Sequence, residues 1–390
     1  MDTKEIARTI SDGIREAVAT VKAEAVRRPP GLELITRSGG QESVREPMRQ
    51  SGSRFGAYVR AVALGARLAR HPADVARMLG ADDTVVRALN ESTLSAGGVF
   101  VPEEFSREVI TALQHAAVVR RAGARVLTMN TDTLRVGRFA GSATASWISE
   151  GADITASVPQ TEEIVLTTKR LAALVPISND LLRDAGVDVD LLIRDHLAGL
   201  MAAEEDVAFI RGDGTVNRPK GIRYWADPAN VFAANATVNV TNIVADLVKA
   251  VRLVSEGLRR NMVRPGWIMA TRTFLGLTAL RDQGQWVFGT LAVPEPTLLG
   301  YPVFVTDQIP TNLGTGADES EVYFVDFGHC VIGQRQEVEI VASGEASYVK
   351  GGQVVSAFSR NETVIRAILR IDFALAYAKA ASVITAVKWQ

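Results

Sequence analysis

The sequence predicts an α+β protein on three observations. The stretch from Asp188 to Gly214 has the period of one long helix, strand-like segments precede it, and a compact mixture of helices and strands follows it. At 1.5 Å per residue, a helix of about 23 residues would span roughly 35 Å. The helix should end at Gly212, because glycine is the usual residue just beyond a helix C-terminus.

The apolar face of this helix is predicted from residues that recur at steps of three and four. They are Leu191, Leu192, His196, Gly199, Leu200, Ala203 and Val207. His196 is therefore expected to be a packed side chain rather than a ligand. The acidic residues Glu204, Glu205 and Asp206 fall largely between these positions, and we expect them on a solvated or inter-subunit face.

The composition is that of an ordinary globular chain. It has 390 residues, of which 47% are hydrophobic and 22% charged, enough for two or three domains. The net charge of −1 argues against a strongly basic nucleic-acid-binding protein. A single cysteine, Cys330, excludes an intramolecular disulfide. We find no signal peptide and no membrane span, so a soluble cytoplasmic chain is expected.

The N-terminal region is predicted to be helical in two parts. Residues 4–28 form an amphipathic helix that either pairs with another helix or packs on its own domain, and residues 31–53 form a polar linker. Residues 54–89 form a second helical region, interrupted near His71-Pro72 and rich in arginine. Its arginines are Arg54, Arg60, Arg67, Arg70, Arg77 and Arg87. They either contact nucleic acid or line a solvated helix face, which is the favoured interpretation.

Residues 90–98 are small and flexible and mark the best domain boundary in the chain. A short helix over 102–119 follows. Residues 126–139 and 163–177 then read as two long strands joined by small and polar residues. They predict an extended hairpin with little core of its own, which would need partners to be stable.

The part of the chain after the long helix reads as mixed helices and strands. We expect a loop over 219–234, then a helix over 241–260 capped by Thr241 or Asn242, a buried strand over 267–270 and a helix over 271–282. A turn at 298–300 should lead into a strand over 301–306. A meander of three short strands (EVYFVDF, HCVIGQ and EVEIVAS) with turns at Gly328 and Gly333 should follow, then a loop over 344–360 and strands over 362–388.

No catalytic, cofactor or metal site is predicted. The four histidines have no metal-ligand spacing, and no phosphate-binding or nucleophile motif occurs. The alternative is an enzyme with a site around Asp326, His329 and Cys330. It is weak, because adjacent residues of a strand point to opposite faces and no acid, base and nucleophile converge.

Four segments together resemble the major capsid proteins of tailed bacteriophages with the HK97 fold. They are TLSAGGVFVPEEF at 93–105, WISEGADITASVPQTEEIVLTTKRLAALVPISNDLLRD at 147–184, AAEEDVAFIRGDGTVNRPKGI at 202–222, and LLGYPVFVTDQIP at 298–310. The resemblance covers residues 93–387, and the order of the segments matters more than any one of them.

The resemblance implies an HK97-like division of the chain. Residues 181–221 would carry the spine helix of a peripheral (P) domain with long antiparallel strands. The other parts would be a helical scaffold-like segment that a protease could remove (1–92), an N-terminal arm with a short helix (93–125), an E-loop hairpin reaching over a neighbouring subunit (126–180), an axial (A) domain (222–360), and C-terminal strands that return to the P and A domains (361–390).

The same resemblance implies a structural, non-enzymatic function. The chain would self-assemble, as pentamers and hexamers, into the icosahedral capsid around a double-stranded DNA genome. It would assemble in the host cytoplasm and reside in the virion, with a portal and possibly scaffold, protease or cement proteins. Contact with packaged DNA would be non-specific. The alternatives are an encapsulin-type nanocompartment and the capsid of a prophage or gene-transfer particle.

Overall fold

The computed structural model describes residues 53–68, 70–91, 99–100, 103–139, 161–183, 187–215, 217–258 and 261–389. The chain divides into two compact units, Met1–Arg49 and Gln50–Gln390, and all described residues belong to the second. The helix expected over 4–28 and nearly all of the linker expected over 31–53 lie outside the described residues.

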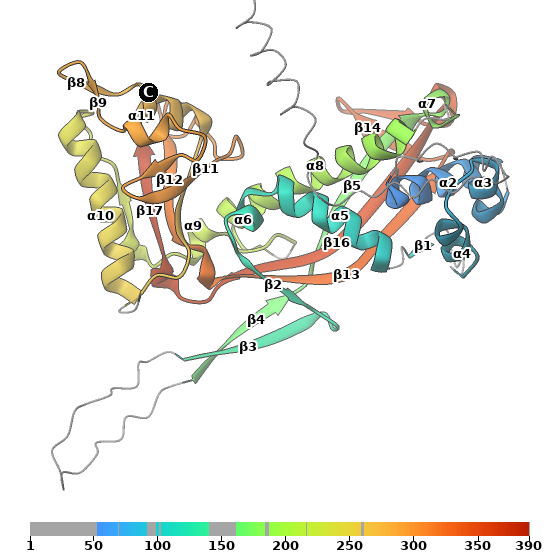
Figure 1. Ribbon diagram of the computed structural model, residues 1–390, viewed down its shortest axis with the longest axis horizontal. Helices are drawn as coiled ribbons and strands as arrows, with labels where there is room; N and C mark the ends of the chain where they lie inside the picture. The colour runs from blue at the N-terminus through green and yellow to red at the C-terminus, as the bar shows by residue number, and fades with distance from the viewer. Residues whose placement is uncertain are drawn as a thin grey trace, which may run out of the picture. The chain divides into compact units, whose positions relative to one another are not determined.

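The described helices confirm most of the predicted ones, although their bounds differ by a few residues (Figure 1). They are α2 (Arg54–Leu68), α3 (Pro72–Met78), α4 (Asp83–Glu91), α5 (Glu103–Ala116), α6 (Val118–Arg121), α7 (Asn179–Arg183), α8 (Val187–Arg211), α9 (Ile222–Trp225), α10 (Val240–Leu258) and α11 (Thr271–Ala279). Short 3₁₀ turns include η1 (Pro228–Asn230) and η3 (Phe327–His329).

The strands form two main sheets and three hairpins, so the predicted α+β class is confirmed. The five-stranded sheet has the order β1-β13-β16-β5, with β2 parallel to β13. Its strands are β1 (Val99–Phe100), β2 (Arg125–Thr128), β5 (Lys169–Ser178), β13 (Cys330–Ser343) and β16 (Glu362–Leu375).

The six-stranded sheet has the order β10-β11-β7-β12-β17-β6. Its strands are β6 (Val231–Ala233), β7 (Pro265–Met269), β10 (Thr297–Leu298), β11 (Tyr301–Val305), β12 (Ser320–Asp326) and β17 (Ala381–Val387). The hairpins are β3 (Thr133–Phe139) with β4 (Thr161–Thr167), β8 (Arg281–Asp282) with β9 (Gln285–Trp286), and β14 (Ser347–Lys350) with β15 (Gln353–Ser356). One continuous apolar core includes residues of both main sheets.

The long helix α8 is confirmed over 25 residues, but its predicted apolar face is the outward one. Leu192 and Leu200 keep 55% and 45% of their surface exposed, and His196 is exposed as well. The buried side chains are instead those of a different stripe, which includes Ile193 and Leu197. Apolar residues surround this helix, so the three- and four-residue spacing fits two stripes. Packing against α5, α2 and β5 decides which one is buried.

The N-terminal helices α2–α4 belong to the main unit, unlike the predicted separation of residues 1–92. Helix α2 packs on α8, α5 and β13, and it buries Phe55, Tyr58 and Val59 completely. The approach to α8 is close at Gly56, where an added Cβ would lie 1.9 Å from the backbone oxygen of Asp190. Small, polar composition after α4 therefore does not mark a domain boundary.

The arginines of this region divide by burial. Arg54, Arg70, Arg77 and Arg87 are exposed, as the solvated-face interpretation predicts. That interpretation is wrong for Arg60, because its Nε donates to the carbonyl of Leu182 at 2.9 Å inside the core. The break at 71–72 is confirmed, since the His71 side chain accepts from the Ala73 N–H and a proline opens α3.

The predicted extended hairpin over 126–180 has a different pairing from the one expected. Each arm is two strands: β3 pairs with β4, whereas β2 and β5 leave the hairpin and join the five-stranded sheet. The paired part also has a small core, in which Ile164 and Leu166 pack with Met129, Val331 and Ala374. Each arm is divided into two strands because β2 pairs with β13 and β5 pairs with β16, whereas β3 and β4 pair only with each other. Residues 140–160 lie outside the described part.

The predicted three-strand meander is wrong. EVYFVDF lies in β12 of the six-stranded sheet, but residues 330–343 form one long strand, β13, of the other sheet. Gly333 is not a turn residue. It lies inside β13, where an added Cβ would be 2.5 Å from the Met129 sulfur, so the glycine admits Met129 to the hairpin core.

Two smaller expectations also differ. Helix α10 is capped by Asn239, whose side-chain oxygen accepts from the Asn242 N–H at 2.8 Å, rather than by Thr241 or Asn242. The loop expected over 344–360 contains the hairpin β14/β15. The buried strand β7, the turn between β10 and β11, and the division of residues 362–388 into β16 and β17 are confirmed.

Candidate functional site

The residues of the alternative enzyme site lie together, but as a structural turn. The Asp326 carboxylate accepts backbone N–H groups of Val263, Arg264 and Gly328 at 2.8–3.2 Å. Cys330 is fully buried, and burial raises the pKa of its thiol far above the ordinary range, which disfavours the reactive thiolate. These groups fix the exit from β12 and do not make a nucleophilic pair.

Metal-binding clusters and membrane-spanning helices are two other features that bear on function in the described part of the chain. No group of three or more His, Cys, Asp or Glu side chains there could hold a metal ion. Within the same residues, no helix combines the length and the apolar character needed to cross a membrane.

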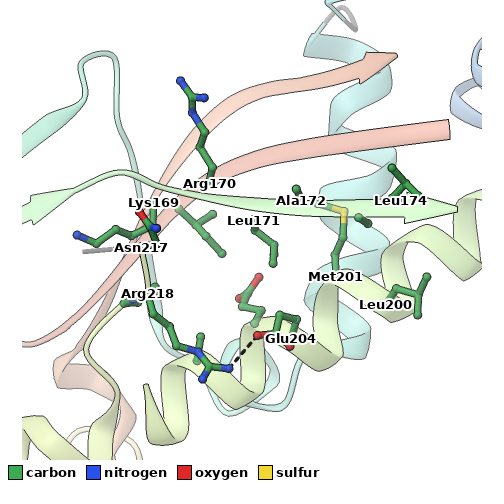
Figure 2. Close-up of a pocket in the computed structure, with 15 residues that line it drawn as sticks. Lys169, Arg170, Leu171, Ala172, Leu174, Leu200, Met201, Glu204, Asn217 and Arg218 are labelled. Carbon is green, nitrogen blue, oxygen red and sulfur yellow. Dashed lines mark hydrogen bonds and ion pairs between the residues drawn. The ribbon is translucent and has the colours of Figure 1, made fainter. Parts of the chain in front are cut away.

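A groove lies between β5 and α8, with a volume of about 560 Å³ (Figure 2). Ala172 and Leu174 of β5 and Leu200 and Met201 of α8 form its apolar walls. Its charged side chains include Lys169, Arg170, Glu204 and Arg218. Sequence reasoning missed this groove because it placed Leu200 on the buried face of the helix.

Strand β5 gives the groove a second property, which is a free strand edge. It pairs with β16 along one edge, and it is the last strand in the order of the five-stranded sheet as described. An edge strand presents unpaired backbone N–H and C=O groups that an added strand can pair with. Leu174 and Leu200 are half exposed beside this edge, so the groove suits an extended apolar segment.

The acidic residues on α8 behave differently from one another. Glu204 is exposed, as expected, and pairs with Arg218 at 2.9 Å (Figure 2). Glu205 is buried below the groove, where Arg120 binds it through Nε at 2.5 Å and Nη2 at 3.1 Å. Arg120 also donates to the side-chain oxygen of Gln334 at 2.6 Å. The expectation of a solvated Glu205 is wrong, because a bidentate arginine neutralises it in the core.

Asp206 is also buried, and it caps a neighbouring helix. Its carboxylate accepts the N–H groups of Val118 and Val119 at 2.8 and 3.2 Å, at the start of α6. Burial, partly offset by these bonds, raises its pKa to about 6. Glu205 therefore connects α8 through Arg120 to β13, and Asp206 connects α8 to the start of α6.

The raised pKa of Asp206 predicts an unusual pH dependence. Its folded pKa of about 6 exceeds the ordinary value of 3.8, so the folded state binds more protons between these values. This group should therefore raise the free energy of unfolding by roughly 2 kcal/mol as the pH falls from 7 to 4. We expect Asp206→Asn to lack this gain, measured by urea unfolding of unassembled subunits. Parallel pH curves for both proteins would contradict the prediction.

Charged residues fasten the β3/β4 hairpin to the rest of the subunit at both ends of its paired strands. Asp132 accepts from Arg335 of β13 at 3.3 Å, and its backbone oxygen accepts the Thr168 N–H at 2.9 Å. Arg138 bonds both to Glu162 on β4 and to the carbonyl of Ala376. The hairpin is thus held at its base by Asp132 and at the far end of its paired strands by Arg138.

A model of the phage capsid family matches residues 97–386. The chain belongs to the phage capsid family. Membership confirms the prediction of a structural subunit of a phage shell, assembled from many copies, and makes the chain a component of the phage particle. Helices α2–α4 precede the matched range, although they pack into the same unit.

The chain is also similar in sequence to curated capsid proteins of phages. The chain is 38% identical over 296 residues to the major capsid protein of Klebsiella oxytoca phage phiKO2, which covers 75% of this chain and 68% of that protein. It is 26% identical over 258 residues to the capsid polyprotein of Pseudomonas phage PAJU2, covering 62% of this chain. The chain spans only 37% of that polyprotein's length.

Solved capsid structures show the same fold. The capsid of the native GTA particle superposes with a TM-score of 0.51 at 23% identity, covering 69% of this chain and 89% of that one. The Microbacterium phage Oxtober96 structure gives 0.51 at 17% identity, covering 69% and 91%. The predicted HK97-like capsid fold is confirmed, and at these identities the likeness is one of fold alone.

Proposed function

We propose that this phage capsid protein forms, as pentamers and hexamers, the icosahedral shell around the double-stranded DNA genome of a tailed phage. The observation that carries the proposal is the half-exposed apolar stripe of α8 beside the free edge of β5, since both require a partner to cover them. The chain performs no catalysis in this role. It assembles in the host cytoplasm and remains in the virion.

We propose a domain division that is based on the two main sheets. We assign α8 with the long strands β5, β13 and β16 to the P domain, and the six-stranded sheet with α10 and α11 to the A domain. The hairpin β3/β4 with residues 140–160 is the E-loop. Under this assignment the A domain gives way to the P domain after β12, earlier than the boundary at 360 expected from the sequence.

Electron microscopy of the full chain expressed alone tests the proposal. Closed shells large enough for a genome are the expected result, and small uniform shells would favour an encapsulin-type nanocompartment. The GTA likeness keeps a gene-transfer particle or prophage capsid as a second candidate. DNA extracted from native particles separates these, because random host DNA would indicate the gene-transfer particle. A portal, scaffold, protease or cement protein would appear as additional bands in those particles.

We infer that the groove binds the E-loop of a neighbouring copy. Residues 140–160 carry two charged side chains, Glu150 and Asp153, and both are acidic. The groove presents Lys169 and Arg170 beside its apolar walls. Complementary charges favour docking in one orientation.

A charge-swap experiment tests this contact. Lys169→Glu with Arg170→Glu should reduce the shell yield at least tenfold, because acidic residues then face acidic residues. Adding Glu150→Lys and Asp153→Lys should restore it. The exposed pair Arg77→Glu and Asp74→Lys on α3 is the matched control and should not affect assembly. Failure of the second swap to rescue the first would exclude residues 140–160 as the occupant.

A further inference from the structure

Two arginines of the β3/β4 hairpin form similar ion pairs on opposite faces. Side chains alternate along a strand, so Leu134, Val136 and Arg138 lie on one face of β3 and Arg135 lies on the other. The first face is the inner one, because Leu134 and Val136 pack on the hairpin core. Arg138 therefore stands near the outer end of this face, where an apolar residue would continue the pattern.

The guanidinium of Arg138 reaches both within the hairpin and outside it. Its Nε donates to Glu162 on β4 at 3.0 Å, and its Nη1 donates to the carbonyl of Ala376. Its central carbon lies 5.8 Å from the centre of the Tyr377 ring, which is within the range of a cation–π contact. The planar fork of an arginine can make these bonds at the same time, whereas the single ammonium of a lysine cannot reproduce that geometry.

The residues that receive Arg138 belong to the joint between the two main sheets. This joint consists of residues 376–380, which connect β16 to β17, and of η3, which connects β12 to β13. The Ala376 N–H donates to the His329 carbonyl at 2.8 Å, and the rings of Tyr377 and His329 meet edge to face at 5.0 Å. Arg138 thus contacts the joint at the point where its two connections are bonded to each other.

The contact is separate from the apolar core of the hairpin. Ile164 and Leu166 of that core are buried, whereas the side chains of Arg138 and Glu162 keep 28% and 50% of their surface exposed. Loss of the bonds from Arg138 would therefore leave the apolar packing of the hairpin in place. One partly exposed side chain carries the attachment of the outer end.

We propose that Arg138 is a latch that fixes the direction of the hairpin relative to the six-stranded sheet, because it fastens the outer end of β3 to the joint. With the latch closed, the hairpin and the joint move as one body. With the latch open, the hairpin is held only through its core and its base. The latch acts within a single subunit and goes beyond the proposed function. Where the hairpin acts as the E-loop, the latch sets the direction in which it reaches toward a neighbouring copy.

The distance between two spin labels tests the latch in the full chain, kept below the concentration at which subunits assemble. Gly137→Cys labels the hairpin, and Val248→Cys labels α10, which packs on β12 and β17. An added Cβ at Gly137 meets nothing within 4 Å, Val248 is 48% exposed, and the native Cys330 is buried and should stay unlabelled. We expect one narrow distance distribution in this labelled chain, and Arg138→Ala should at least double its width.

Arg135→Ala is the matched control. Arg135 pairs with Glu163 at 3.1 Å across the same two strands, and among the described residues its side-chain bonds stay within the hairpin. This change should leave the width of the distribution unaltered. Arg138→Lys should broaden the distribution nearly as much as Arg138→Ala, because it keeps the charge but loses the fork.

Two results would overturn the latch. One is an unchanged width in either Arg138 variant, and the other is equal broadening in Arg135→Ala, which would indicate a general loss of hairpin stability. Neither result bears on the proposed function, which microscopy of the unmodified chain tests separately.

Discussion

Replacing Gly56 with alanine should lower the free energy of unfolding of the subunit by about 3 kcal/mol. The added Cβ would lie 1.9 Å from the Asp190 oxygen and 2.5 Å from its carbonyl carbon, and both belong to backbone that cannot rotate away. Helices α2 and α8 would have to separate, which would stretch the ion pair between Arg60 of α2 and Asp190 of α8, whose atoms lie 3.4 Å apart. Urea unfolding of the unassembled subunit measures the effect.

Gly199→Ala is the matched control. Gly199 also lies inside a helix, but nothing is within 4 Å of the position of an added Cβ. Because alanine is the better helix former, this variant should be more stable by roughly 0.5–1 kcal/mol. Equal effects at the two sites would mean that α2 does not pack on α8 in solution.

The same contact predicts the effect of truncation. Removal of residues 1–92 would expose the α8 surface that α2 covers, whereas removal of 1–49 would leave that surface covered.

Removing the charge of Arg120 should destabilise the subunit by about 3–5 kcal/mol. Arg120→Met keeps the length of the side chain but leaves Glu205, which has no exposed surface, without its partner. Burial already raises the pKa of Glu205, and loss of the guanidinium would raise it further. The variant should therefore regain stability as the pH falls and Glu205 becomes protonated, as urea unfolding at several pH values would show.

The double variant Arg120→Met with Glu205→Gln separates charge from packing. It should recover a large part of the loss, because no uncompensated buried charge remains. Arg77→Met is the exposed comparison: its pair with Asp74 spans 2.6 Å, but both side chains are more than half exposed, so the change should cost less than about 1 kcal/mol. A small loss for Arg120→Met would show that water reaches Glu205.

Local patterns predicted the elements well but could not predict their neighbours. The period of α8, the break at His71-Pro72 and the turn before β11 depend on nearby residues, and the structure confirms them. The buried face of α8 depends on α2 and α5, which pack from distant parts of the chain. The same holds for Glu205, whose partner is 85 residues away.

The sequence also did not predict which sheet each strand belongs to. A strand's own sequence shows whether it is extended, but not which strand it pairs with. Gly333 therefore indicated a turn, although the glycine makes room for Met129. The groove beside β5 was out of reach for the same reason, because an edge exists only once the order of strands is known. The segments that resemble capsid proteins predicted the fold and the structural function without resolving these contacts.

The two sheets are joined by a pair of connections that run together. One passes from β12 to β13 through η3, and the other passes from β16 to β17 through residues 376–380. The Ala376 N–H donates to the His329 carbonyl at 2.8 Å, and the strands on either side pair with each other in both sheets. The two sheets are therefore linked by two chain segments that lie side by side. Tension between the two sheets is shared by two covalent chains that are hydrogen-bonded to each other, so the subunit resists being pulled apart between its sheets.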